Sequence, residues 1–473
     1  MFGTDIFRKS LLFISFFTSL FAVATPTKAA NSERHVFNSD DRPLAIVLDS
    51  KAAHHGEFSW NMCKASEVKG EVEKLSLPEY DDSSWMPAVV PGTVLTSLVY
   101  NKVYPDPYYG DNNKLSNEKI PDISKVGREF YTYWFRTEFD LPDSYKGKTV
   151  WLQPDGINYR AEVWINSNLV STMAGMFKRD IIDITDFVRV GQKNAIAILV
   201  HPIDIPGTSR SKTWGAKGEF HNGGDGNIGW NVTQLMTIGW DFTYHDGIRD
   251  RNTGIWKGIY IYATGKAALR NVFVKSTFTN GDYRIAHEDA SVEVVNPGNN
   301  TLKCTVYGEI ENTGIKFSKE VSLLRGETRE VSFSHSEYPQ LNITNPKLWW
   351  PVNKGSHPLY KIHFKVVENG NISDSLTERF GIREITTSRN TPDKSKMFIV
   401  NGKPLFIRGS NWLPEAMLRT SDQRLEAESR YTAQSGLNLL RRWGGRIADF
   451  DRFYSLSAEL GFFYCHAFYL SRV

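Results

Sequence analysis

Two tryptophans near the end of the chain stand beside an amide or a charge, as Asn411-Trp412 in the run FIVNGKPLFIRGSNWLP and as Arg442-Trp443 in NLLRRWGG. A third tryptophan, Trp240, is followed by Asp241 in a long glycine- and tryptophan-rich region between residues 201 and 256. An aromatic ring beside a carboxylate on a long loop can bind a sugar, because the ring stacks on the C–H face while the carboxylate binds hydroxyls. From pattern alone, a buried tryptophan next to a capping aspartate explains Trp240-Asp241 equally well.

Strands and helices in regular alternation would position the first two pairs. Two apolar runs, 398–400 and 405–407, flank Asn401-Gly402, a dipeptide that accepts positive φ and favours a tight hairpin. We expect the second run to be a strand that ends just before Asn411 and Trp412. Helix-compatible segments follow at 421–435 and 449–460, and apolar strands precede Arg442 and occupy 462–465.

This β-α-β-α-β series predicts parallel strands joined by helices, the opening of a (β/α)8 barrel. Barrel active sites lie at the carboxyl ends of the strands, where Asn411, Trp412, Arg442 and Trp443 are expected. A whole barrel takes about 250 residues, so at most the first three βα units fit between residue 390 and Val473.

The two preceding regions are predicted to be β-sandwiches. Residues 31–265 contain short alternating strands at short intervals, typical of a sandwich or jelly roll, at 131–139, 149–153, 161–165, 181–184 and 194–200. Residues 266–389 carry the period-two, β-branched pattern of a small immunoglobulin-like sandwich, at 272–279, 290–295, 301–309, 316–324, 327–333 and 360–368.

The runs FIVNGKPLFIRGSNWLP and NLLRRWGG, with GWDF and RDRNTGIW upstream, closely resemble glycoside hydrolase family 2, especially its β-mannosidase, endo-β-mannosidase and exo-β-glucosaminidase branch. The resemblance implies a galactose-binding-like jelly roll at 31–265, an immunoglobulin-like domain at 266–389 and the N-terminal fragment of a TIM-barrel catalytic domain at 390–473. It also implies a set of substrate-binding residues: Trp240, Asp241, Asn411, Trp412, Arg442 and Trp443. Phe242 departs from the Trp-Asp-Trp that the family commonly has, and the segment 249–256 resembles the one that closes the first domain, with structural roles for Arg251 and Trp256.

Glycoside hydrolysis needs two carboxyl groups about 5 Å apart in the retaining mechanism that the family uses. In the family, the acid/base glutamate follows barrel strand 4 in an Asn-Glu pair and the nucleophile follows strand 7, and neither position exists in this sequence. We interpret the carboxylates beyond residue 395 as helix caps and solvated faces, namely Glu415, Asp422, Glu426, Glu428, Asp449, Asp451 and Glu459. No catalytic residue is therefore expected in this chain.

Two functions remain open. The first is the N-terminal portion of a secreted retaining β-glycosidase that acts on β-mannosides or β-glucosaminides in carbohydrate catabolism. The second is a non-catalytic carbohydrate-binding protein. An Asn-Glu pair and a later glutamate at barrel spacing, encoded downstream of Val473, would establish the first. Both predict an oligosaccharide or glycan as partner, and neither fixes the sugar.

The first 30 residues read as a signal peptide. Arg8 and Lys9 precede an apolar run, 11–24, that is shorter than the roughly 20 residues of a membrane span, and Ala22-Val23-Ala24 is a plausible cleavage site. An uncleaved signal anchor is the alternative. We expect a secreted or periplasmic protein that has no membrane contact after cleavage.

Composition excludes other classes of protein. With 41% hydrophobic and 23% charged residues the chain fits a soluble protein of two or three domains, and a net charge of +3 without a basic tract argues against nucleic acid. Cys63, Cys304 and Cys465 are too far apart for a disulfide framework or a metal site. Residues 224–229 match the dinucleotide fingerprint without its strand and helix, so no cofactor is expected. The sequence makes no prediction about the oligomeric state.

Overall fold

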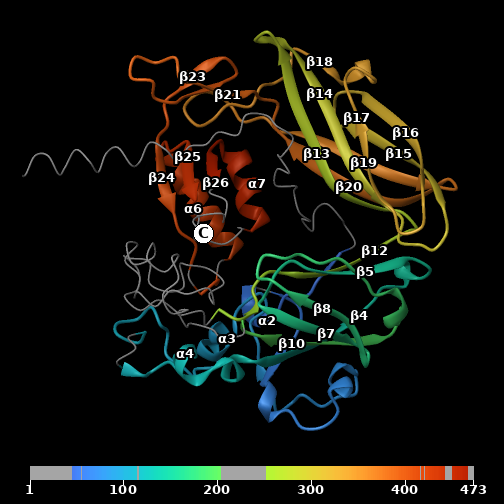
Figure 1. Cartoon of the computed structure of the whole chain (residues 1–473), viewed down its shortest axis with the longest axis vertical. Coiled ribbons are helices and arrows are strands. Elements are labelled where there is room, and N and C mark those ends of the chain that lie inside the picture. Colours follow the sequence, from blue (N-terminus) through green and yellow to red (C-terminus); the bar gives the residue numbers. More distant parts are fainter. Residues whose placement is uncertain are drawn as a thin grey trace, which may run out of the picture. The chain divides into compact units, whose positions relative to one another are not determined.

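The computed structural model describes residues 45–54, 56–113, 117–203, 252–415, 417–419, 421–442 and 450–466. Trp240, Asp241, Arg251, Trp443 and Asp449 lie outside these ranges, so the predictions for them are not addressed by the fold. The described elements form three groups that follow one another along the chain (Figure 1).

The first group is built on two antiparallel sheets. One has the order β1 (Ile46–Val47), β12 (Ile259–Thr264), β5 (Thr149–Pro154), β9 (Ile182–Asp183). The other has the order β3 (Met86–Pro87), β2 (Asn61–Lys64), β4 (Tyr133–Asp140), β10 (Lys193–His201), β7 (Arg160–Ile165), β8 (Asn168–Ala174). A short ribbon pairs β6 (Ile157–Asn158) with β11 (Gly254–Ile255). Helices α2 (Lys51–His54), α3 (Val94–Tyr100) and α4 (Ile123–Val126) and the 3-10 turns Ala65–Glu67, Val72–Ser76, Arg128–Tyr131, Asp143–Tyr145 and Thr185–Phe187 complete it.

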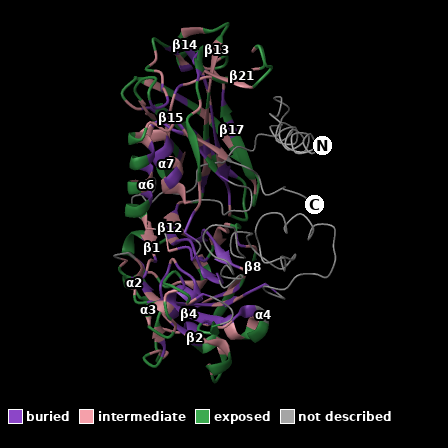
Figure 2. Ribbon diagram, turned by 90° about the vertical axis from the view of Figure 1, so that its left-hand side faces the viewer, coloured by how far each residue is buried: buried purple, intermediate pink, exposed green. Residues whose placement is uncertain are grey.

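Alternating side chains of both sheets meet in one hydrophobic core. Phe135 on β4 pairs with Ile198 on β10, and both pack with Leu152 and Ile261 of the other sheet. Figure 2 shows the buried residues concentrated along strands of this group. The predicted β-sandwich is therefore confirmed, and Pro87 lies in β3 at the edge of its sheet, where a missing N–H breaks no ladder.

The second group is the predicted immunoglobulin-like sandwich. One sheet has the order β13 (Ala268–Thr279), β14 (Asp282–Val295), β17 (Thr328–Phe333), with β18 (Asn342–Thr344) also pairing β14. The other has the order β16 (Ile315–Leu323), β15 (Leu302–Ile310), β19 (Tyr360–Glu368), β20 (Asn371–Phe380). A 3-10 turn spans Pro339–Leu341. Val292, Val306, Phe333 and Phe364 contribute to a core separate from that of the first group.

The third group begins with a hairpin and continues with parallel strands. The hairpin sheet is β21 (Ile385–Ser388), β22 (Met397–Val400), β23 (Lys403–Leu405), and its turn has positive φ at Asn401 and Gly402, as predicted. Strands β24 (Gly409–Trp412), β25 (Leu439–Arg442) and β26 (Phe463–His466) then form a parallel sheet, joined by α6 (Asp422–Gln434) and α7 (Asp451–Leu460).

Local signals define both helices of this third group. The Ser421 side chain caps α6 by accepting the Arg424 amide, and Gly461, with φ 78°, ends α7 in the left-handed conformation. The helices pack on the sheet through Leu425, Leu440, Phe453, Leu456 and Phe462. None of the helices in the described ranges has both the length and the apolar character needed to cross a membrane.

One strand was predicted at the wrong place. We expected a strand at 405–407 with Asn411 and Trp412 beyond its end, but β23 stops at Leu405 and belongs to the hairpin. The first parallel strand is β24, which contains Asn411 and Trp412. The apolar run at 405–407 was a poor guide to the strand because Phe406 is 78% exposed. Gly409 and Ser410 instead form a strand through their pairing with β25.

Candidate functional site

The carboxyl ends of β24 and β25 place four polar or aromatic residues side by side. Asn411 pairs with Arg441, and Trp412 pairs with Arg442. Because side chains alternate between the faces of a strand, each pair lies on its own face of the sheet. The Asn411 Oδ1 accepts a hydrogen bond from Arg441 Nη1 at 3.2 Å, and both residues are exposed. This amide and this guanidinium are accessible polar groups at the ends of the two strands.

Trp412 and Arg442 point toward the helices. Trp412 Nε1 donates to Glu428 Oε2 at 2.9 Å, and its ring stacks on Phe453 with centroids 4.8 Å apart. Arg442 is almost fully buried and donates from Nη1 to the Tyr454 hydroxyl at 2.5 Å. The structure thus separates two predicted sugar ligands from Asn411 and gives them packing contacts with α6 and α7. Their contact with a substrate stays a prediction.

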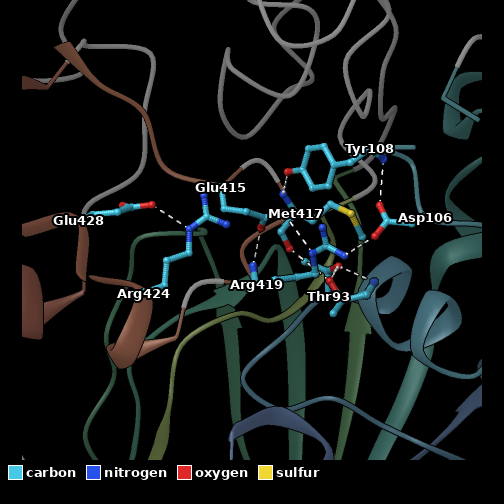
Figure 3. A network of polar contacts seen from close by, with 9 residues as sticks. Thr93, Asp106, Tyr108, Glu415, Met417, Arg419, Arg424 and Glu428 are labelled. Atoms are coloured by element: carbon cyan, nitrogen blue, oxygen red, sulfur yellow. Dashed lines mark hydrogen bonds and ion pairs between the residues drawn. The ribbon is translucent and has the colours of Figure 1, made fainter. Parts of the chain in front are cut away.

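The segment after β24, residues 413–419, contains a buried acid (Figure 3). The backbone N–H of Arg419 donates to Glu415 Oε2 at 2.6 Å, and Arg419 Nε donates to Oε1 at 3.1 Å. Burial raises the pKa of Glu415, although the amide and guanidinium of Arg419 act in the opposite direction. Our interpretation of Glu415 as a helix cap or solvated side chain was therefore wrong, because this carboxylate is buried in an ion pair.

The same segment is bonded to the first group of elements. Arg419 Nη1 donates to Asp106 Oδ2 at 3.0 Å, and its guanidinium lies 4.8 Å from the centroid of the Tyr108 ring. The Tyr108 hydroxyl accepts the Met417 N–H at 3.2 Å, and Thr96 Oγ1 donates to the Met417 carbonyl at 3.2 Å. Figure 3 shows Asp106 and Tyr108 facing Met417 and Arg419 across this contact.

Four other carboxylates of the third group are also paired with arginines. Glu426 pairs with Arg430 at 2.6 Å and Glu428 with Arg424 at 2.8 Å, both across one turn of α6. Glu459 pairs with Arg379 of β20 at 2.8 Å, and Asp451 lies 3.6 Å from Arg179. Hydrogen bonding by Arg430 lowers the pKa of Glu426, the reverse of what a general acid requires. These contacts give the four residues structural roles.

Four residues of the site were not predicted from the sequence: Arg419, Asp106, Tyr108 and Arg441. The i, i+4 spacing of Glu415 and Arg419 was a signal for an ion pair, and Arg441 was visible next to Arg442. Nothing local could link Asp106 to Arg419, because their contact spans 313 positions. In contrast, the structural role predicted for Trp256 is confirmed, since it is fully buried and donates from Nε1 to the Met176 carbonyl at 2.9 Å.

Comparison with known proteins extends the interpretation of both sandwiches. A domain model described as "Glycosyl hydrolase 2 galactose-binding domain-like" matches residues 67–257, and one described as "Glycosyl hydrolases family 2" matches residues 267–383. Together these matches cover well over half of the chain.

Individual relatives agree with the domain matches. The chain is 37% identical over 387 residues to a mannosylglycoprotein endo-beta-mannosidase of Lilium longiflorum, covering 80% of this chain and 38% of the lily protein. It is 26% identical over 455 residues to an exo-beta-D-glucosaminidase of Streptomyces avermitilis, covering 95% of this chain and 45% of that protein. The crystal structure of an Amycolatopsis orientalis exo-chitosanase has the same fold over 89% of this chain and 43% of its own, with a TM-score of 0.68 at 24% identity.

The chain therefore spans less than half the length of these relatives. Over that span it carries the galactose-binding-like and immunoglobulin-like domains in the order of the matches, each closed around its own core. On these grounds, the chain belongs to glycoside hydrolase family 2.

Proposed function

We propose that this chain supplies the N-terminal, sugar-binding portion of an exported β-glycosidase that cleaves β-mannosides or β-glucosaminides with retention of configuration. The observation that carries the proposal is the sequence of modules. Two family 2 β-domains are followed by a parallel β-α-β-α-β unit, and the segment after its first strand is bonded to the first domain. In the proposal, β24, β25 and β26 are the first three strands of a (β/α)8 barrel.

The exposed groups at the ends of these strands suit the binding of sugar hydroxyls. Asn411 offers an amide that can donate and accept, and Arg441 offers several donors in a planar fork. Named relatives act on mannosides or glucosaminides, which supports these two sugar classes. Trp240 and Asp241 of the first domain, with Trp443 after β25, complete the proposed site.

Chemistry at this site would require groups from outside the stretch that the chain covers. Retaining hydrolysis needs one carboxylic acid to protonate the leaving oxygen and a second carboxylate to attack the anomeric carbon, about 5 Å from the first. Among the carboxylates described on the third group, four form ion pairs with arginines: Glu415, Glu426, Glu428 and Glu459. We propose that the catalytic pair of the family follows barrel strands 4 and 7.

Titration calorimetry of the purified chain tests this proposal. We expect saturable binding of β-linked mannose or glucosamine oligosaccharides, no binding of α-linked glucose oligosaccharides, and no turnover of nitrophenyl β-mannoside or β-glucosaminide. Asn411→Ala, Arg441→Met and Asp241→Ala should each weaken binding by roughly ten- to a hundredfold, since a charge-assisted hydrogen bond contributes about 1.5–3 kcal/mol. Arg430→Met, on the exposed face of α6, is the control that should change nothing.

Absence of saturable binding to either sugar class would refute the sugar-binding function. Turnover by this chain that disappears on Glu415→Gln would refute the assignment of the catalytic pair to other positions. Equal binding of α- and β-linked sugars would favour a carbohydrate-binding protein without glycosidase specificity.

A further inference from the structure

Two apolar side chains of the segment 413–419, those of Met417 and Leu418, are buried outside the core of its own parallel sheet. Met417 is fully buried and packs with Leu95 of α3 and with Ile120. Leu418, which is 2% exposed, packs with Met176 and Trp256. All four partners belong to the first domain, whereas the core of the parallel unit is formed by its own helices and strands. The segment is thus an element of the third group that is packed as part of the first domain.

Backbone groups of the same segment are also satisfied by the first domain. The Met417 N–H donates to Tyr108, and the Met417 carbonyl accepts from Thr96, whose own hydroxyl lies 2.8 Å from that of Thr93 at the start of α3. Leu418 has φ 59°, a left-handed conformation that is unfavourable for a leucine and persists only where surrounding contacts hold it. These contacts supply that restraint.

Arg419 joins the two sides of this contact. Its backbone N–H and Nε both bind Glu415, which closes the segment into a tight ring, and this leaves Nη1 to bind Asp106. The guanidinium is also stacked over Tyr108. Asp106 in turn accepts the Tyr108 N–H through Oδ1 at 2.9 Å, so the aspartate binds both the arginine and the tyrosine on which that arginine stacks (Figure 3).

We propose that Arg419 is a positioning residue for sugar binding. It holds the segment 413–419 against Asp106 and Tyr108 of the first domain and thereby fixes the carboxyl end of β24, where Asn411 lies. The first domain then shapes the sugar site through its 93–108 region. This inference rests on the function proposed above.

Hydrogen exchange tests the contact itself, because the Met417 amide donates to the Tyr108 hydroxyl and the Arg419 amide donates to Glu415, the partner of the same arginine. In the full chain, Asp106→Asn and Tyr108→Phe should each raise the exchange rate of peptides covering 413–419 at least tenfold, although both changes lie more than 300 positions away. Arg379→Met is the matched control, since it removes another arginine–carboxylate pair, to Glu459 of α7, without touching this segment. Unchanged exchange in both first-domain variants would overturn the proposal.

Calorimetry with the oligosaccharide that binds the unmodified chain tests the positioning. Arg419→Met and Tyr108→Phe should weaken its affinity about five- to tenfold, Arg419→Lys should restore part of it, and Arg379→Met should leave it unchanged. If the variants loosen 413–419 without changing affinity, the contact is structural and the positioning role is refuted. If the unmodified chain binds neither sugar class, the proposed function fails and the positioning role with it, while the exchange data still decide whether the contact exists.

Discussion

At the scale of single residues, a buried carboxyl of the immunoglobulin-like domain has a strongly raised pKa. Glu288 is fully buried on β14 and accepts a hydrogen bond from Ser276 Oγ at 2.8 Å through Oε2. Its Oε1 has no hydrogen-bond partner among the described residues. Burial raises the pKa of this carboxyl to about 7, so it takes up a proton on folding at any pH between roughly 4.5 and 7.

Glu288→Gln should make the domain less sensitive to pH. Because the folded pKa of Glu288 lies above the unfolded value, its stabilising effect is complete below about pH 4.5 and is lost as the pH rises through 7. The variant should match the parent near pH 4.5 and should exceed its free energy of unfolding by about 3 kcal/mol at pH 8, because the pKa rises from 4.5 to about 7 and each unit is worth ~1.4 kcal/mol. Urea unfolding at both pH values measures this difference in stability, with Glu320→Gln, at an exposed position of β16, as the control.

Burial also raises the pKa of Glu378 to about 7, so part of the pH dependence of stability should remain in the Glu288→Gln variant. If Glu288→Gln stabilised the domain equally at pH 8 and at pH 4.5, the gain would come from packing and not from ionisation.

The sequence could identify Glu415 as a residue of interest but could not assign its role. A carboxylate near a helix start is usually a cap, and only the fold brings Arg419 and Asp106 together around it. Trp412 shows the same limit, because its type and neighbours fit a sugar site, whereas the face of β24 that carries it is decided by register. Residue type was thus predictable, and side-chain direction was not.

At the scale of elements, strong local signals gave correct predictions. The Asn401-Gly402 hairpin and helices α6 and α7 form where the sequence placed them. Strand β24 was missed because its sequence, Gly-Ser-Asn-Trp, contains two residues that are depleted in strands, Gly409 and Asn411, and its partner β25 lies about 30 residues away. Elements defined by partners and not by their own residues were the ones beyond prediction.

Helix α7 is secured by the immunoglobulin-like domain, and Trp349 is the test of that contact. Its indole Nε1 donates to the Ala458 carbonyl at 2.8 Å, and the ring lies 5.3 Å from that of Phe463. Trp349→Phe keeps a ring but removes the donor, so we expect a loss of about 1–2 kcal/mol and faster amide exchange in peptides covering the end of α7. Trp350→Phe, at a less buried neighbour, should have little effect. Equal effects of the two changes would contradict the specific role of the hydrogen bond.

At the scale of the whole molecule, the order of modules was predictable and their mutual dependence was not. Each sandwich has its own alternating pattern and its own core, so the sequence predicts two separate β-domains. The contacts of 413–419 with the first domain join residues more than 300 positions apart, and no local pattern encodes them. The barrel itself stays a proposal.

Arg179 offers a test of this dependence. It binds Asp155 of the first domain through Nε at 2.7 Å and Nη2 at 3.2 Å, and it also lies 3.6 Å from Asp451 at the start of α7. Arg179→Met leaves the buried Asp155 carboxylate without its cation, so the free energy of unfolding should fall by about 2–4 kcal/mol. Lys178→Met, next to it in an exposed pair with Asp180, should change stability by under about 0.5 kcal/mol.

Amide exchange in α7 should rise in Arg179→Met, because the same arginine faces both parts of the molecule. A fall in stability without any change in α7 would show that Arg179 serves the first domain alone.

The burial of Met417 and Leu418 in the first domain also decides how this chain can be recombined with its relatives. A crossover between the immunoglobulin-like domain and the parallel strands looks natural from the sequence, but it would separate Met417 from Leu95 and Arg419 from Asp106. Chimeras that inherit 93–108 and 415–419 from one parent keep these partners matched, and those that split them leave a buried methionine and an arginine against foreign surfaces. The two stretches that must come from one parent are thus far apart in the chain. In a set of chimeras, we expect the folded ones to be mainly those in which both stretches come from the same parent.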